Sequence, residues 1–268
     1  MSVDSMQVYR GMDIGTAKPT TEHQLRVQHY MIDLVEPEVE YSAAEFQQAG
    51  RETITSGEHE RMLVVGGSGL HFRALVDPHT FPPHDPEVRD ELEGLTDPAA
   101  ALVNVDPGAG QVVDLANRRR VVRALEVHRL TGLTPSVRAV TPEAESLRRY
   151  QGLFDFVAAG VDPGSESNAR IRSRVIDMGE RGFVDEVRSL QGRLGPTARS
   201  AVGYRQLTQH LQGHSHLDEA WAEVERATAG LARRQRTYFR RDPRIRWVPW
   251  HPDLKARVAA VRAVWGLN

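Results

Sequence analysis

The chain has 268 residues, of which 40% are apolar and 26% charged, and its formal net charge is −2. This balance is typical of a folded globular protein and excludes a chain that is disordered throughout. The absence of cysteine excludes a disulfide scaffold and a thiolate metal site, and no run approaches the roughly 18 apolar residues of a membrane span. We therefore expect a cytoplasmic protein without a membrane partner.

The first part of the chain alternates short apolar runs with helical patterns. Residues 1–3 are typical of the end of a buried strand, and residues 41–56 favour a helix. An apolar run at 62–65 leads through the glycine-rich turn 66–69 into a helical pattern at 70–76. Strand, glycine turn and helix in this order predict a parallel α/β sheet.

The last part of the chain repeats this alternation. Apolar runs at 154–161 and 245–248 predict two further strands. Helical patterns fill the remainder at 169–180, 183–190, 204–211 and 218–240.

The middle of the chain has a different pattern, with no run typical of a strand. Prolines gather at positions 82, 83 and 86, and the periodic segments 86–93 and 118–130 favour helices. We interpret residues 83–149 as a helical insert, and residues 1–82 and 150–268 as the α/β core that surrounds it.

Charge is unevenly distributed along the chain. Residues 1–60 have a net charge of −7, whereas residues 118–150 have +5 and residues 226–246 have +7, almost all from arginine. Two basic blocks on a nearly neutral chain indicate a polyanionic partner such as nucleic acid. Solvated helix faces in an arginine-rich protein are the alternative.

Two short motifs follow predicted strands, where α/β folds place their sites. Asp4 comes directly after the first strand and is a candidate general base, although an aspartate there can also cap the next helix. The turn Gly66-Gly67-Ser68-Gly69 precedes a helix and could hold an anion, although a plain strand-to-helix connection has the same pattern.

The stretch DSMQVYRGMDIGTAKP at 4–19 resembles the tRNA dimethylallyltransferase family, also called tRNA isopentenyltransferases or IPP transferases. The likeness spans nearly the whole chain in the family's order. It continues through VVGGSGL (64–70), DPEVR (85–89), RRVVRALEVHRLTG (119–132), GFVDEV (182–187), AVGYRQL (201–207) and RRQRTYFRRDPRIRW (233–247). The resemblance implies a P-loop-NTPase-like parallel sheet core with a helical, tRNA-binding insert.

The resemblance also implies an activity: transfer of a dimethylallyl group from dimethylallyl diphosphate to N6 of adenosine 37, next to the tRNA anticodon. Mg²⁺ is the implied cofactor, the anticodon stem-loop is the implied partner, and a complete chain would be a monomer. Asp4 matches the base and Gln7 a contact to the flipped adenosine. Ser68 matches a hydroxyl that contacts substrate, and Arg170 and Arg174 match partners of the diphosphate.

A larger set of residues matches the family's tRNA contacts. Arginine suits this role because its planar group donates two hydrogen bonds to one phosphate, although any single arginine can also lie on a solvated helix face. The set comprises Asp4, Ser5, Met6, Gln7, Ser68, Arg89, Arg119, Arg120, Val121, Val122, Arg123, Val202, Gly203, Tyr204, Arg205, Arg233, Arg234, Gln235, Arg236, Thr237, Tyr238, Phe239 and Arg240.

The family's phosphate-binding loop, of the form GxTxxGK[ST], does not occur in this sequence. We therefore expect a core that lacks its first strand and this loop, with no residue of the chain holding the metal. Three interpretations remain open: a shortened chain of an ordinary enzyme, a paralogue that binds tRNA without catalysis, and a transferase or kinase for a small molecule. The retained Asp4 and the arginine-rich stretches favour the first.

Overall fold

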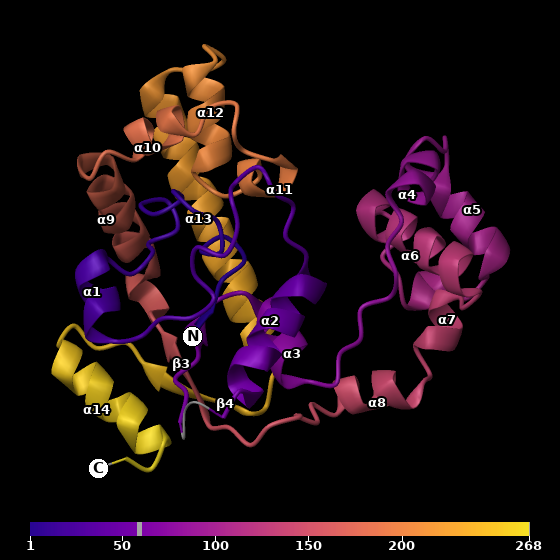
Figure 1. The fold of residues 1–268 in the computed structure, drawn as a ribbon, viewed down its shortest axis with the longest axis horizontal. Helices are drawn as coiled ribbons and strands as arrows, with labels where there is room; N and C mark the ends of the chain where they lie inside the picture. Colours follow the sequence, from indigo (N-terminus) through magenta and orange to yellow (C-terminus); the bar gives the residue numbers. More distant parts are fainter. Residues whose placement is uncertain (58–60, 268) are drawn as a thin grey trace. The chain divides into compact units, whose positions relative to one another are not determined.

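The computed structural model describes residues 1–57 and 61–267. It divides into two compact units (Figure 1): one comprises Met1–Val76 with Asp155–Asn268, and the other Asp77–Phe154. The second unit contains the whole segment 83–149 that the sequence suggested as an insert, and it extends a few residues beyond that segment at both ends.

Asp4 follows a pair of short parallel strands in the first unit. β1 (Ser2–Val3) pairs in parallel with β2 (Val65–Gly66). A Cβ at Gly66 would come within 2.1 Å of the carbonyl oxygen of Val3, so this close pairing needs glycine. The carboxyl ends of the two strands therefore lie together, with Asp4 after one and the glycine turn after the other.

A second pair of parallel strands is formed later in the chain. β3 (Ala158–Asp162) pairs along its whole length with β4 (Ile245–Pro249). The strand predicted at 245–248 is thus confirmed, whereas the one predicted at 154–161 begins at Ala158.

The described residues form these two separate strand pairs instead of the continuous parallel sheet that the sequence predicted. The strand expected at 62–65 is reduced to the pairing at Val65–Gly66, and Leu63 and Val65 are 57% and 60% exposed. Parallel strands are stable when both faces are covered. This run has one partner strand and little cover, so only two of its residues pair.

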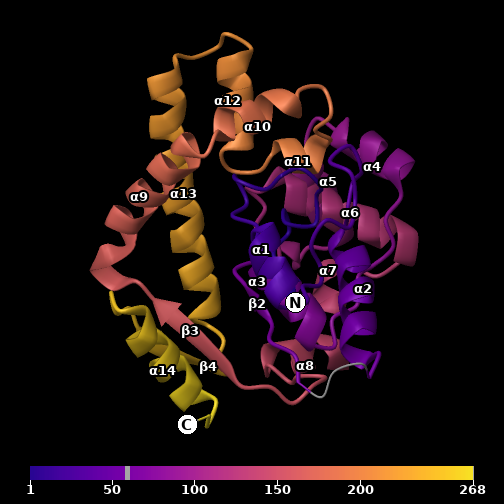
Figure 2. The same ribbon diagram turned by 60° about the vertical axis from the view of Figure 1, so that its left-hand side comes forward.

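Helices make up most of the first unit, and those predicted from periodicity form within two residues of their predicted bounds. Figure 2 shows α13 alongside α9, and α14 next to β3 and β4. The helices are α1 (Thr21–Arg26), α2 (Ala43–Thr55), α3 (Gly69–Val76), α9 (Ser167–Glu180), α10 (Phe183–Ser189), α11 (Pro196–Arg199), α12 (Tyr204–Leu211), α13 (Leu217–Phe239) and α14 (Leu254–Val264).

The core of this unit joins its N-terminal loops to its C-terminal helices. Tyr9, Phe46, Phe183 and Tyr204 are fully buried in one cluster. The rings of Phe183 and Tyr204 meet edge to face, with centroids 5.0 Å apart, which fixes the start of α12 against α10.

The second unit is described throughout and contains only helices. Its apolar core includes Leu102, Val121 and Val122, all essentially inaccessible to solvent. Its α-helices are α4 (Pro86–Glu93), α5 (Pro98–Val105), α6 (Arg118–Thr131), α7 (Pro135–Arg138) and α8 (Pro142–Arg148).

A buried carboxylate ties two of these helices together. Glu126 of α6 is fully buried and accepts hydrogen bonds from Arg123 at 2.8 Å, the backbone N–H of Asp85 at 3.0 Å and the ring of His84 at 2.5 Å. Burial alone would raise the pKa of Glu126, but these donors outweigh it and lower the pKa. The side chain is therefore a charged anchor between α6 and the start of α4.

Candidate functional site

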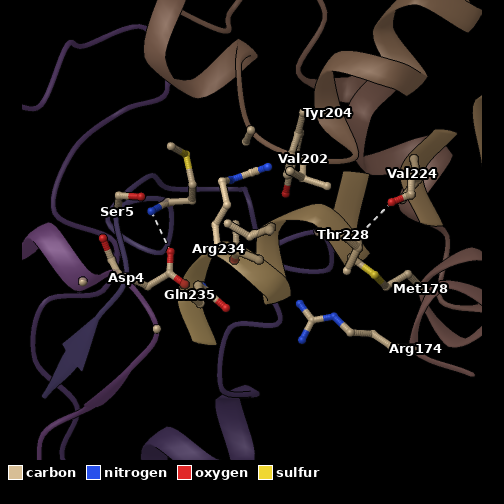
Figure 3. A pocket seen from close by; sticks show the side chains of 18 of the residues that line it. Asp4, Ser5, Arg174, Met178, Val202, Tyr204, Val224, Thr228, Arg234 and Gln235 are labelled. Carbon is tan, nitrogen blue, oxygen red and sulfur yellow. Dashed lines mark hydrogen bonds between the residues drawn. The ribbon is translucent and has the colours of Figure 1, made fainter. Parts of the chain in front are cut away.

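A cavity of about 310 Å³ lies within the first unit, at the carboxyl ends of β1 and β2. Loops of the N-terminal segment and the turn after β2 line it, together with α9, α13, the start of α12 and the loop before α12 (Figure 3). Its lining includes Asp4, Ser5, Met6, Gly15, Thr16, Gly67, Ser68, Gly69, Arg174, Met178, Val202, Tyr204, Arg234, Gln235 and Tyr238.

Asp4 is held by the turn that follows it. Its Oδ1 accepts hydrogen bonds from the backbone N–H groups of Met6 at 2.8 Å and Gln7 at 3.4 Å. No described residue donates to its second oxygen. One side of the carboxylate is therefore fixed, and the other is available to a ligand in the cavity.

Ser68 has a partner that the sequence analysis missed. Its Oγ lies 2.7 Å from Nδ1 of His71, a ring that packs edge to face on Phe46. Burial lowers the pKa of His71, and the nearby Asp4 carboxylate partly opposes that shift. A serine followed three residues later by a histidine at a helix start is the signal that could have indicated this pair.

α13 packs directly on the turn beside Ser68, most tightly at Gly69. A Cβ at Gly67 would come within 2.7 Å of Nε2 of Gln235, and one at Gly69 within 2.2 Å of the ring of Tyr238. The close approach holds the Ser68 hydroxyl at the cavity wall.

Two arginines bring unbalanced positive charge to the cavity. In Figure 3, Arg174 of α9 and Asp4 lie on opposite sides, with Gln235 of α13 between them in this view. Burial lowers the pKa of Arg174, and the Asp4 carboxylate opposes the shift. Neither Arg174 nor Arg234 forms an ion pair or hydrogen bond with the residues that the structure describes. A cavity with two free guanidinium groups and one carboxylate is suited to an anionic ligand that also carries a removable proton.

The structure does not bring two of the predicted residues into this cavity. The amide of Gln7 accepts from Ser2 Oγ at 2.7 Å and donates to the carbonyls of Thr16 at 3.1 Å and Ala17 at 3.4 Å, so it braces the N-terminal loop. Its assignment to an adenosine contact has no support from this geometry.

Arg170 lies outside the cavity lining as well. Its guanidinium carbon stacks 3.3 Å from the ring centroid of Trp250, whose ring also packs against Arg257. Arg170 and Arg174 are one turn apart on α9, but only Arg174 lines the cavity.

The predicted tRNA contacts in the second unit separate into exposed and buried groups. Arg89, Arg119, Arg120 and Arg123 border a surface hollow of about 490 Å³. Arg119 and Arg120 are exposed and have no partner among the described residues.

Other members of that set are committed to the fold. Arg123 donates to Glu126 and to the carbonyls of Pro82 and Pro83, and Arg89 pairs with Glu93. Val121 and Val122 are core residues, 0% and 1% exposed. Their side chains therefore pack inside this unit and are not exposed to a partner.

The predicted contacts on α13 and α12 are also divided. Arg236 and Arg240 pair with Asp162, whereas Arg233 and Arg205 are exposed. Thr237 is exposed, Phe239 packs on Phe72, and Gly203 is buried with a φ of +93° that favours glycine.

Neither a metal cluster nor a membrane helix is found in the parts of the chain that the structure describes. No three His, Asp or Glu side chains of residues 1–57 and 61–267 come together as ligands for an ion. No helix within these residues is long and apolar enough to cross a membrane.

Comparison with known proteins gives relatives over nearly the whole chain. The matching family is described as IPP transferase, and its model matches residues 7–242. A tRNA dimethylallyltransferase of Bifidobacterium animalis subsp. lactis is 41% identical over 257 residues, covering 92% of this chain and 72% of that protein. One of Streptomyces avermitilis is 44% identical over 260 residues, covering 92% and 81%. The crystal structure of the tRNA isopentenylpyrophosphate transferase of Bacillus halodurans is 32% identical with a TM-score of 0.70, covering 99% and 86%.

Proposed function

Because the chain belongs to the IPP transferase family, we propose that it transfers a dimethylallyl group from dimethylallyl diphosphate to N6 of adenosine 37 in tRNA. The observation that carries the proposal is the cavity in which Asp4 faces the unpaired Arg174 and Arg234. Its volume of about 310 Å³ lies at the lower end of the range of small-ligand sites. A tRNA substrate also agrees with a cytoplasmic reaction.

In this proposal Asp4 is the general base. The N6 amine attacks the first carbon of the dimethylallyl group, the carbon–oxygen bond to diphosphate breaks, and diphosphate leaves with the electron pair. The proton released from N6 passes to the free oxygen of Asp4. The turn at Met6 supports this role, because it holds one carboxylate oxygen while the other has no donor in the described residues.

Arg174 and Arg234 stabilise the leaving diphosphate, and Ser68 contributes a hydroxyl. Guanidinium groups are suited to this role because they donate paired hydrogen bonds to phosphate oxygens. Arg234 replaces Arg170 in our assignment, because Arg170 is stacked on Trp250.

The anticodon stem-loop is the proposed macromolecular partner. The exposed Arg119 and Arg120, and Arg233 and Arg205 of the first unit, are positioned to meet phosphates. Such contacts position RNA without reading its sequence, whereas the cavity receives the flipped base.

Mg²⁺ enters the proposal as a companion of the substrate diphosphate. The described residues do not fit a protein-held magnesium site, because Asp4 is the one carboxylate among the cavity's lining residues. We also infer a core of the P-loop type, supported by the parallel strand pairs and by the glycine turn between β2 and α3.

The test is a transfer assay with unmodified tRNA, Mg²⁺ and labelled dimethylallyl diphosphate. We expect the label in tRNA at adenosine 37, and we expect Asp4→Asn to slow transfer by roughly 10²–10⁴ while tRNA binding stays unchanged. A matched control is Asp218→Asn, an exposed aspartate in the first turn of α13 and outside the lining. Binding of tRNA without label would support a non-catalytic paralogue, and label in a small acceptor alone would support a small-molecule transferase.

A further inference from the structure

The carboxylate of Glu186 in α10 is the meeting point of two walls of the cavity. It accepts hydrogen bonds from the backbone N–H groups of Asp13 at 3.0 Å, Ile14 at 2.7 Å and Gly15 at 3.2 Å. It also accepts from the hydroxyl of Tyr204 at 2.5 Å. Four donors converge on its two oxygens, although the motif GFVDEV in which it lies has no assigned role.

Three successive backbone N–H groups form a concave site for an anion, and this one is filled by the chain's own carboxylate. The loop that carries these groups lies outside every helix and strand of the described residues. Its far end is fixed by Lys18, a buried cation whose Nζ bonds Asp13 and Asp33 at 2.6 Å each. The loop is therefore held by charge at both ends.

Two of the four donors to Glu186, the N–H of Gly15 and the hydroxyl of Tyr204, belong to residues that line the cavity. Gly15 and Thr16 line it from the loop, and Tyr204 lines it from α12. A Cβ at Gly15 would come within 2.4 Å of the rings of Phe183 and Tyr204, so the two walls already touch at their closest possible approach. A shift of the loop toward these rings must therefore displace them.

The same loop also connects Glu186 to Asp4. Gln7, which lies in the turn after Asp4, donates its amide hydrogens to the carbonyls of Thr16 and Ala17. The loop that Glu186 holds thus braces the turn that orients the Asp4 carboxylate.

We propose that Glu186 is a positioning residue, which holds the 13–17 loop and Tyr204 in the register that lets the cavity accept the target base beside Asp4. This inference rests on the proposed transfer to tRNA. Burial, with the adjacent carboxylate, raises the pKa of Tyr204, so its hydroxyl stays protonated and keeps donating. Glu186 contacts neither Asp4 nor the two unpaired arginines of the cavity, Arg174 and Arg234. It acts through the groups that it binds.

The test compares Glu186→Gln with Asp185→Asn. The neighbouring Asp185 is exposed and pairs with Arg188, so it controls for loss of a charge at this point of α10. Glutamine keeps the volume of Glu186 but places an amide N–H₂ against N–H and O–H donors. We expect single-turnover transfer to fall by about 10- to 100-fold, since small displacements in a site cost this much. The tRNA Kd should stay within about threefold, because phosphate contacts dominate it.

A second readout does not depend on transfer. Amide hydrogen exchange at one or more of residues 13–15 should become at least about tenfold faster in Glu186→Gln and stay unchanged in Asp185→Asn, since glutamine keeps only one of the two acceptor oxygens. If the unmodified protein transfers no label, the proposed function fails, and the exchange measurement still tests the loop. Should Glu186→Gln fail to fold, Tyr204→Phe removes one of the four donors and keeps the ring packing, and it is measured in the same way.

Two results would overturn the inference. One is a wild-type transfer rate in Glu186→Gln. The other is a variant with a lower melting temperature whose transfer rate per folded molecule equals that of the parent protein, when both are assayed below that melting temperature. Glu186 would then stabilise the fold without positioning the site.

Discussion

The orientation of the Ser68 hydroxyl is set by one neighbour. Oγ of Ser68 lies 2.7 Å from Nδ1 of His71, and the ring of His71 is fixed by its edge-to-face contact with Phe46. A neutral imidazole leaves one ring nitrogen as an acceptor, whereas a protonated one can only donate. The protonation state and tautomer of His71 therefore decide whether the Ser68 hydroxyl donates to Nδ1 or accepts from it.

This pair predicts how stability depends on pH. Burial lowers the pKa of His71 below its ordinary value of 6.5, against the opposing effect of Asp4. Below pH 6.5 the unfolded chain binds a proton that the folded chain does not bind, so stability falls as the pH falls toward the folded pKa. Phenylalanine fills the same space and cannot titrate. In His71→Phe, the loss of unfolding free energy between pH 7.5 and pH 5.5, measured by urea denaturation, should therefore be smaller than in the parent protein.

His214→Gln is the matched control for this measurement. His214 is exposed on the loop after α12, and its removal should leave the loss between the two pH values as large as in the parent protein. An equal loss in His71→Phe would show that His71 titrates as it does in the unfolded chain.

Individual site residues differ in how far the sequence could predict them. Asp4 and Ser68 follow strand ends, and the family motifs indicate Arg174, so these three could be placed in one site from the sequence. Gln7 and Arg170 could not be placed, because the groups that hold them become neighbours only when the chain folds. The stacking partner of Arg170, for example, is Trp250, about eighty positions later in the chain.

At the level of helices and strands, the sequence predicts what depends on local periodicity. The helices at 86–93 and 204–211 form with their predicted bounds, because a repeat of 3.6 residues reports one buried face. The helix α5 was missed because its sequence is almost entirely apolar and shows no such repeat. Its start was readable, since Asp97 caps the helix by accepting from Ala100 N–H at 2.9 Å, just before a proline.

The short strands depend on partners that the local sequence does not specify. β1 and β2 pair over two residues each, and the pairing rests on the close approach that Gly66 permits. An apolar run can therefore indicate that a strand forms, but it does not indicate how many of its residues pair with a neighbouring strand.

The packing of α6 on α4 predicts a stability effect at Glu126. The side chain is fully buried and accepts from Arg123, His84 and the backbone N–H of Asp85. Glu126→Gln keeps one acceptor oxygen but sets an amide N–H₂ against these donors. We expect it to lower the unfolding free energy by about 1.5–3 kcal/mol, the value of hydrogen bonds to a charged group, in a denaturant titration at pH 7.

Glu91→Gln is the control in the same unit. Glu91 is exposed and pairs only with Arg129 across the surface, so its replacement should leave the unfolding midpoint unchanged. If the two substitutions changed the unfolding free energy equally, the hydrogen bonds to buried Glu126 would contribute no more to stability than the exposed ion pair of Glu91.

For the molecule as a whole, an arginine can attract a polyanion only where its charge is not already neutralised by a carboxylate of the same chain. The net charge is −2, and several arginines of the basic blocks are already paired: Arg236 and Arg240 with Asp162, and Arg123 with Glu126. The charge available to a polyanion is therefore smaller than the sequence blocks indicate. In the second unit it is concentrated at Arg119 and Arg120, which have no partner among the described residues.

This distribution predicts which substitutions change the salt dependence of tRNA binding. Each phosphate contact that is lost lowers the slope of log Kd against log salt concentration by roughly 0.7–0.9. Replacing Arg119 and Arg120 together by alanine should therefore reduce the slope by about 1.5 and weaken binding at low salt, measured by filter binding at several salt concentrations.

Arg148→Ala with Arg149→Ala is the control, because both side chains are exposed in the same unit but already pair with Glu145. The control should change the slope less, since its guanidinium groups must first leave a carboxylate. An unchanged slope in the Arg119 and Arg120 variant would mean that this face does not meet RNA, and the family resemblance of the segment would then reflect packing of α6 alone.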